Sequence, residues 1–183
     1  SRFKTGKNIV RLHDGDPCLY GAISEQVCGL ADAGIDVEVV PGVSAYQATA
    51  AKLKAELTIP GLVQTIVLSR SGGRTGVPEK ESLEKLAALR ASLCIYLSAR
   101  HVEQVEGVLL NYYSENTPVA IAYRVGWKDE WIQVIPLHQM ATISKERNLI
   151  RTTLYVVSPA LNATKNRSNL YNPNYAHLFR PEG

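Results

Sequence analysis

Two short segments, residues 10–21 and 39–45, each run from an apolar stretch through a glycine-containing turn into a helix start. In the first turn, Gly15 allows a positive φ or a close approach of the backbone to a ligand, because it has no Cβ to obstruct either. Asp16 and Pro17 then suit the first positions of a turn or helix. In open α/β sheets, ligands bind beyond the carboxyl ends of strands, where such turns gather. We therefore predict that the two turns form one rim and that this rim carries the function.

The periodicity of apolar residues predicts alternating strands and helices, and hence an α/β fold. The strand–helix–strand–helix order at the start of the chain favours a parallel sheet with right-handed crossovers. Gly34 is expected at the C′ position of the first helix, and Ser44 and Ser98 are expected to cap later helices. Predicted strands cover residues 8–13, 35–40, 63–69, 92–97, 118–124, 131–135 and 152–157. The strand over residues 131–135 is expected to pair with the strand over residues 118–124. Predicted helices cover residues 21–33, 44–55, 79–89, 98–110 and 136–144.

A break in the pattern at residues 57–61, Leu-Thr-Ile-Pro-Gly, marks the expected domain boundary. We expect a partial N-terminal α/β domain over residues 1–59 and a C-terminal α/β domain over residues 60–161. Residues 162–183 are rich in Asn and lose periodicity, which is typical of a tail on the surface. The chain has no initial Met and enters its first predicted strand almost at once, so we expect the first domain to be N-terminally incomplete.

Composition narrows the class of protein. Of 183 residues, 45% are hydrophobic and 20% charged, which is typical of a globular protein. The net charge of only +3 fits an acidic small-molecule substrate and argues against a nucleic-acid partner. No apolar run approaches the ~20 residues of a membrane span, and no signal-peptide pattern opens the chain. The cysteines, Cys18, Cys28 and Cys94, are odd in number and predict no disulfide framework, so we expect a cytoplasmic protein.

The familiar catalytic signatures are missing from the sequence, and we assign no catalytic residue. There is no phosphate-binding glycine motif and no arrangement of Ser, His and Asp for nucleophilic catalysis. Four histidines share no metal-ligand spacing, so no metal is expected: His13, His101, His138 and His177. The loop of residues 70–80, in contrast, combines three glycines with Arg70, Arg74 and Lys80, whose side chains suit carboxylates. The alternative for this loop is an ordinary solvated surface.

Both glycine turns resemble a known family. Asp-Gly-Asp-Pro-Cys-Leu-Tyr-Gly at residues 14–21 and Val-Pro-Gly-Val-Ser at residues 40–44 are similar to the S-adenosylmethionine-dependent tetrapyrrole methylases. Residues 70–83, Arg-Ser-Gly-Gly-Arg-Thr-Gly-Val-Pro-Glu-Lys-Glu-Ser-Leu, resemble one branch, the precorrin-4 C-11 methyltransferases of cobalamin biosynthesis. Further matches lie at residues 94–98, 119–124, 127–130 and 175–180. The resemblance covers essentially the whole chain, from the middle of the family's first domain onward.

The resemblance implies a two-domain tetrapyrrole-methylase architecture with the first domain truncated, and S-adenosylmethionine as methyl donor in the cleft between the domains. It implies methylation of carbon 11 of precorrin-4 or cobalt-precorrin-4, a small tetrapyrrole substrate, and we expect a homodimer. It places donor contacts, largely through backbone groups, at Asp14, Gly15, Asp16, Leu19, Ser44, Ala45, Leu97, Val125, Thr152 and Thr153. Arg70, Arg74 and Lys80 are the expected contacts for the carboxylates of the substrate.

Three alternatives stay open at this point. The first is a sister tetrapyrrole methylase that acts at another ring carbon. The second is a non-catalytic module for ligand binding or oligomerisation, which the expected truncation favours. The third is an rRNA methyltransferase built on the same fold, which predicts a basic groove that the charge balance does not indicate.

Overall fold

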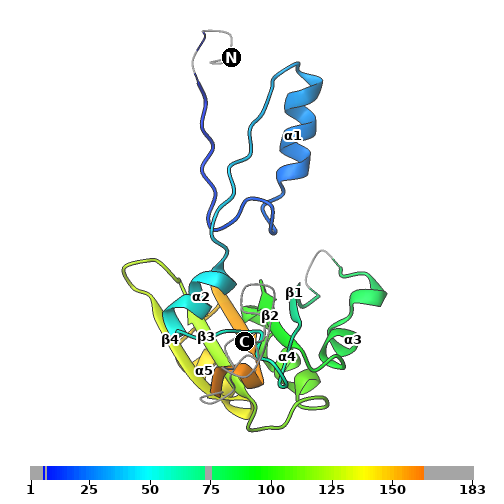
Figure 1. The fold of residues 1–183 in the computed structure, drawn as a ribbon, viewed down its shortest axis with the longest axis vertical. Helices are drawn as coiled ribbons and strands as arrows, with labels where there is room; N and C mark the ends of the chain where they lie inside the picture. Colours follow the sequence, from blue (N-terminus) through cyan, green and yellow to red (C-terminus); the bar gives the residue numbers. More distant parts are fainter. Residues whose placement is uncertain (1–5, 7, 73–75, 163–183) are drawn as a thin grey trace, which may run out of the picture. The chain divides into compact units, whose positions relative to one another are not determined.

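The computed structural model describes residue 6, residues 8–72 and residues 76–162. The chain divides into two compact units, Ser1–Gln47 and Ala48–Gly183, and the division falls inside helix α2 (Ala45–Leu53) (Figure 1). The domain boundary expected after residue 59 lies within the second unit and stays a prediction. Helices and strands follow one another along the described chain, and the expected α/β class is confirmed.

In the first unit, helix α1 (Ile23–Asp32) precedes the start of α2. α1 ends in a Schellman motif, in which Gly34 has φ +67°. The N–H of Gly34 donates to the carbonyl of Ala31 at 2.9 Å, and the N–H of Ile35 donates to the carbonyl of Leu30 at 2.9 Å. These two bonds satisfy carbonyls that the helix end leaves open, and they confirm the C′ glycine predicted from the sequence.

The strands predicted over residues 8–13 and 35–40 are wrong for this structure, because both segments run as irregular chain. Their apolar side chains are exposed: Val10 is 79%, Leu12 88% and Val40 70% accessible. A strand depends on a hydrogen-bonded neighbour and on cross-strand packing, and among the described residues neither segment has a ladder partner. The parallel sheet predicted for the start of the chain is therefore wrong as well.

The second unit is built on a five-stranded mixed sheet with the order β1-β2-β5-β3-β4. β1 (Ile66–Arg70) and β2 (Ser92–Tyr96) are parallel. β5 (Thr153–Val157) lies antiparallel between β2 and β3 (Pro118–Tyr123), and β4 (Trp131–Pro136) pairs antiparallel with β3. The five strands predicted for this half of the chain are confirmed, and so is the pairing of β4 with β3.

The helices of the second unit are shorter than predicted and several begin with a 3₁₀ turn. The helix expected over residues 79–89 divides into η2 (Glu79–Glu81) and α3 (Leu83–Ala87), because Ser82 between them is extended, with ψ 149°. The other elements are η3 (Ala99–His101), α4 (Val102–Leu109), η4 (Leu137–Gln139), α5 (Met140–Glu146) and η5 (Pro159–Asn162).

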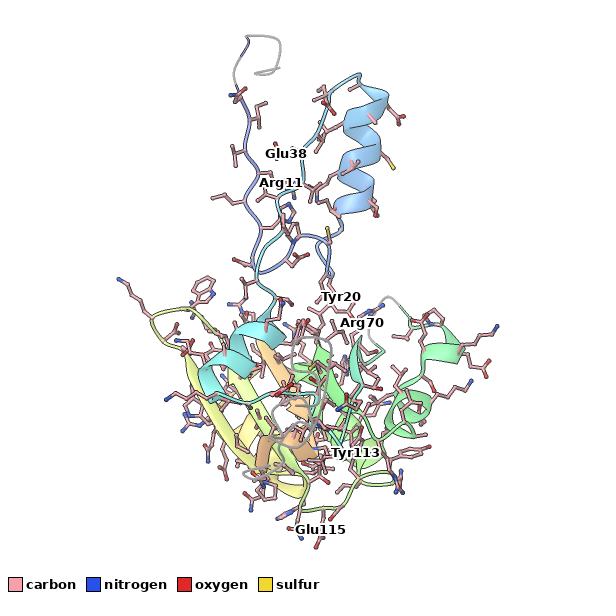
Figure 2. All side chains as sticks on the ribbon, viewed as in Figure 1. Arg11, Tyr20, Glu38, Arg70, Tyr113 and Glu115 are labelled. Atoms are coloured by element: carbon pink, nitrogen blue, oxygen red, sulfur yellow. The ribbon has the colours of Figure 1, made fainter. Side chains whose placement is uncertain are left out.

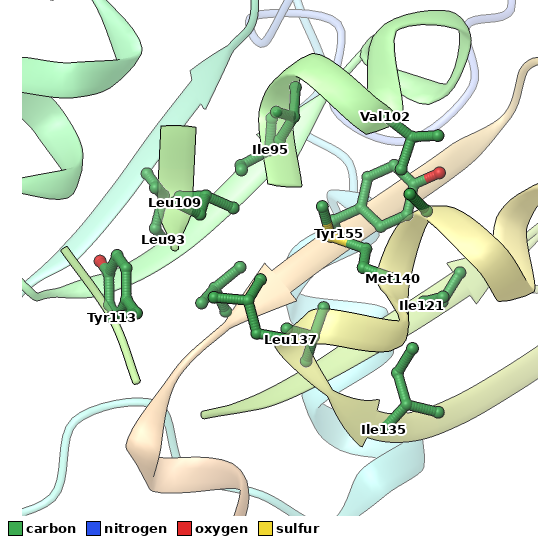
Figure 3. Packing of buried hydrophobic residues seen from close by; sticks show 14 of the residues in the cluster. Leu93, Ile95, Val102, Leu109, Tyr113, Ile121, Ile135, Leu137, Met140 and Tyr155 are labelled. Carbon is green, nitrogen blue, oxygen red and sulfur yellow. The ribbon is translucent and has the colours of Figure 1, made fainter. Parts of the chain in front are cut away.

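Buried aliphatic side chains of the sheet and of helices α4 and α5 form the main core (Figure 3). Leu93 and Ile95 of β2 share this core with Ile121 of β3, and all three are fully buried. Burial of each such side chain contributes about 1.5–3 kcal/mol. The residues between them, such as Cys94 and Ala120, are also buried, so both faces of the central strands are covered. That is why continuous apolar runs, without alternation, predict these strands correctly.

Candidate functional site

The two glycine turns of the first unit lie against each other, as the sequence predicts. A Cβ on Gly15 would be 3.6 Å from the carbonyl oxygen of Val43 and 3.8 Å from the Cα of Ser44. A Cβ on Gly42 would be only 2.0 Å from the carbonyl oxygen of Gly15, so no side chain fits there. Gly15 also has φ +66°, which favours glycine. The two backbones approach closely because both positions lack a side chain.

The carboxylate of Asp16 joins the two turns. One oxygen, Oδ1, accepts the N–H of Cys18 at 2.8 Å within its own turn. The other, Oδ2, accepts the N–H of Gly42 at 3.0 Å in the second turn. Both carboxylate oxygens are thus engaged by main-chain donors, so the side chain of Asp16 holds the rim together. Its expected contact with the methyl donor stays a prediction.

Ser44 and Ala45 lie where the second turn enters α2. The backbone N–H of Ser44 donates to Oε1 of Gln47 at 3.0 Å, which is one half of a capping box with Ser at the N-cap and Gln at N3. Ser44 is buried, whereas Asp14 is exposed and Leu19 is half-buried. The helix start predicted at Ser44 is confirmed, and the capping box orients the main chain at that position.

The four site residues predicted in the second unit lie at the same end of the three central strands of the sheet. The register pairs Tyr123 with Thr153, and the N–H of Arg124 donates to the carbonyl of Thr152 at 2.9 Å. Val125 therefore follows the residue that pairs with Thr152. On the other side of β5, Ile95 pairs with Tyr155. Continuing that antiparallel register brings Leu97 level with Thr153. Leu97, Val125, Thr152 and Thr153 are thus gathered from three neighbouring strand ends.

The backbone at this end of the central strands is strained. Leu97, Arg124 and Thr152 have φ of +53°, +48° and +54°, in the left-handed region that side chains with a Cβ avoid. Each such residue costs about 1–3 kcal/mol, and strain of this kind concentrates at functional sites. Leu97 is also 69% exposed although it is apolar. The sequence pattern carries no signal for these three backbone conformations, since none of the positions is glycine.

The hydroxyl of Ser98 does not cap the following helix, contrary to expectation. It accepts the N–H of Ser71 at 2.8 Å and donates to the carbonyl of Tyr96 at 2.7 Å. Ser98 therefore ties together the carboxyl ends of the parallel strands β1 and β2. The hydroxyl of Ser71 itself is buried and makes no hydrogen bond to the described residues.

The basic residues expected to bind substrate carboxylates are placed only in part. Arg70 is the last residue of β1, at the opposite end of the second unit from Glu115 (Figure 2), and its guanidinium donates to the carbonyl of Gly76 at 2.9 Å. Lys80 is exposed in η2. Arg74 lies outside the described residues. Their joint role stays a prediction.

A surface cavity of about 580 Å³ lies elsewhere in the second unit, between the first turn of α4 and the end of α5. His101, Glu103 and Lys145 are among its lining residues, and none of the predicted site residues lines it. Volume alone therefore does not mark the predicted site.

Within residues 8–72 and 76–162, no three His, Cys, Asp or Glu side chains come together as a metal site would require. No helix in the same part of the chain is long and apolar enough to cross a bilayer. Cys18 and Cys28 are exposed free thiols, and burial raises the pKa of the Cys94 thiol to about 12.

Comparison with known proteins decides the family. Residues 1–141 match the tetrapyrrole (corrin/porphyrin) methylases. The chain belongs to this family. A cobalt-precorrin-4 C(11)-methyltransferase of Methanocaldococcus jannaschii is 42% identical to this tetrapyrrole methylase. The alignment covers 96% of the present chain and 68% of the Methanocaldococcus protein. A precorrin-4 C(11)-methyltransferase of Pseudomonas aeruginosa is 41% identical over 97% of the chain and 72% of its own length.

The fold agrees with that assignment. The X-ray structure of a cobalt-precorrin-4 methyltransferase, a cobalamin biosynthetic enzyme, superimposes with a TM-score of 0.85 at 39% identity. The alignment covers 88% of this tetrapyrrole methylase and 68% of that chain. The resemblance stated from the residues of the two glycine turns is thus confirmed.

Proposed function

We propose that this tetrapyrrole methylase transfers a methyl group from S-adenosylmethionine to carbon 11 of precorrin-4 or cobalt-precorrin-4 in cobalamin biosynthesis. The observation that carries the proposal is the similarity, along nearly the whole chain, to C(11)-methyltransferases at 41–42% identity. A cytoplasmic location and a homodimer belong to the same proposal.

The chain's own residues fit a donor held mainly by main-chain groups. At the end of the central strands, the hydroxyl of Thr153 donates to the carbonyl of Arg151 at 3.1 Å, and Leu97 and Val125 have no polar side-chain atoms. In the first unit, the carboxylate of Asp16 is engaged by two amides. Polar contacts from Asp16, Leu97, Val125 and Thr153 to the donor would therefore fall to the backbone.

The donor supplies a methyl group already activated on a positively charged sulfur, so this chain need offer no nucleophile. The residues then have to orient the reactants and exclude water. Correct alignment of two reactants can lower a barrier by about 7–11 kcal/mol without any acid or base. The apolar side chains of Leu97 and Val125 would offer a bound donor a surface from which water is displaced, which suits a reaction that disperses charge. We assign no proton acceptor.

The substrate carries several carboxylates, and Arg70, Arg74 and Lys80 are the proposed docking groups. A guanidinium binds a carboxylate through two parallel hydrogen bonds, which gives orientation as well as affinity. The position of Arg70 supports this proposal, because it ends β1 beside β2, and ligands bind beyond the carboxyl ends of parallel strands.

The decisive experiment is an anaerobic incubation of the chain with S-adenosylmethionine labelled with carbon-13 in the methyl group, and with precorrin-4 or cobalt-precorrin-4. We expect a product one methyl group heavier, with the label attached to carbon 11 by carbon-13 NMR. Label at another ring carbon would instead identify a sister methylase. Absence of transfer together with no calorimetric heat from S-adenosylhomocysteine would favour a non-catalytic module.

A further inference from the structure

The loop of residues 124–130, which joins β3 to β4, contains Val125 and begins with a backbone conformation that its first residue, Arg124, does not favour. Arg124 has φ +48° and Gly126 has φ +86°, so Val125 lies between two left-handed residues. Glycine adopts this conformation freely, but arginine does not. Such a backbone persists only where surrounding contacts hold it.

Glu130 provides one of these contacts, across the base of the loop. Its Oε2 accepts the N–H of Gly126 at 2.6 Å. Its Oε1 lies 3.1 Å from Nζ of Lys52, which belongs to α2. The hydrogen bond from Gly126, and then the one from Lys52, lower the pKa of the Glu130 carboxyl, so the group is ionised at neutral pH. One carboxylate thus links the residue after Val125 to a helix far away in the sequence.

Arg124 provides a second, separate contact. Its guanidinium forms an ion pair with Asp129 at 2.7 Å and stacks on the ring of Trp127 at 4.2 Å. The N–H of Trp127 in turn donates to the carbonyl of Arg124 at 3.0 Å. This contact closes the loop on itself, whereas Glu130 ties the loop to α2. A change at Glu130 therefore removes the link to α2 and leaves the contacts of Arg124 with Asp129 and Trp127 in place.

We infer that Glu130 is a positioning residue for the methyl donor, because its carboxylate fixes the main chain immediately after Val125 and anchors it to Lys52. This inference rests on the proposed function, in which Val125 contacts the donor. Glu130 acts through Gly126 and does not itself touch the donor.

The test compares three variants with the parent chain of 183 residues. Glu130→Ala removes both contacts, Glu130→Gln keeps an acceptor for the Gly126 amide but loses the charge, and Lys52→Met removes only the ion pair. S-adenosylhomocysteine affinity, measured by calorimetry, should fall about tenfold in Glu130→Ala, as expected for the loss of a hydrogen bond to a charged group. It should fall about threefold or less in the other two.

Glu103→Gln is the matched control, since Glu103 also pairs with a lysine, Lys145, on the surface of the second unit. Its S-adenosylhomocysteine affinity should equal that of the parent. Melting temperature and the amide resonance of Gly126 separate positioning from general stability. In Glu130→Gln the melting temperature should stay within about 2 °C of the parent, as for most surface changes.

The outcomes separate the inference from the proposed function. Equal affinity in the parent and in Glu130→Ala would overturn the positioning role and leave the proposed function standing. A parent chain that binds no S-adenosylhomocysteine would overturn both. A loss of affinity in Glu103→Gln as large as in Glu130→Gln would also overturn the positioning role, because any exposed ion pair would then have the same effect.

Discussion

Asp16 and Gly42, from two different turns, are joined by a hydrogen bond of 3.0 Å from the Gly42 amide to Oδ2 of the Asp16 carboxylate. The bond locks the first glycine turn to the second. We expect Asp16→Ala to raise the hydrogen-exchange rate of the Gly42 amide about tenfold or more, because the lost acceptor is charged. In Asp16→Asn, which retains an acceptor oxygen, the exchange rate of the Gly42 amide should lie between those of Asp16→Ala and the parent. Unchanged exchange in Asp16→Ala would contradict this role.

Gly42 itself is predicted to tolerate no side chain. A methyl group there would meet the carbonyl oxygen of Gly15 at 2.0 Å, so Gly42→Ala should separate the two turns at a cost of about 1–3 kcal/mol. The separation of the turns should appear as faster hydrogen exchange of the Cys18 amide, which donates to the carboxylate of Asp16. Gly29→Ala is the control: nothing lies within 4 Å of its Cβ position in α1, so it should stabilise that helix by about 1 kcal/mol.

The strain at Thr152 predicts a stabilising substitution. Asparagine tolerates the left-handed region better than threonine, and the chain already uses Asn148 at φ +53°. Thr152→Asn should therefore stabilise the fold by up to about 1 kcal/mol, measured by urea unfolding. Thr142→Asn, an exposed change within helix α5, should bring no such gain. If Thr152→Asn proves less stable than the parent, the left-handed conformation is not the source of strain.

Buried acidic protons predict a loss of stability at high pH. Burial raises the pKa of Cys94 from 9.0 to about 12, and burial likewise raises that of Tyr113 from 10.0 to about 12. The unfolded chain releases these protons at lower pH than the folded chain, so stability should fall as pH rises above about 9. Urea unfolding at pH 7 and pH 10 would measure this. In Cys94→Ala, a smaller difference between the two pH values is expected; an identical difference would rule out a contribution from the thiol.

Substrate docking gives a further prediction. If Arg74 binds a carboxylate of the tetrapyrrole, Arg74→Ala should raise the substrate KM about tenfold and leave the affinity for S-adenosylhomocysteine unchanged. Arg90→Ala, an exposed arginine just before β2, serves as control and should leave both values unchanged. Steady-state kinetics and calorimetry on the same preparations would separate the two effects, and an unchanged KM would argue against docking at Arg74.

The sequence predicted the second unit far better than the first. Strands such as β2 and β5 are apolar along their whole length, and the structure covers both of their faces. Residues 8–13 show a similar pattern, but a pattern indicates which face can be buried and not what covers it. The contact between Gly15 and Gly42 was predictable, because a turn without side chains permits close approach.

Parts of the candidate site lay beyond sequence reasoning. The left-handed backbone of Leu97 and Arg124 leaves no compositional signal, since neither residue is glycine. The bond between Lys52 and Glu130 joins positions that only the folded sheet and helix α2 bring together. The donor contacts assigned by resemblance and the substrate contacts of residues 70–80 stay predictions that the experiments above address.

The strand order β1-β2-β5-β3-β4 places the last strand of the described chain in the middle of the sheet. During synthesis on the ribosome, β1–β2 and β3–β4 can exist only as two separate pairs until residues 153–157 emerge from the exit tunnel. Each pair would meanwhile present an open edge, the kind of surface that promotes aggregation. Completion of the sheet therefore has to wait for the synthesis of β5.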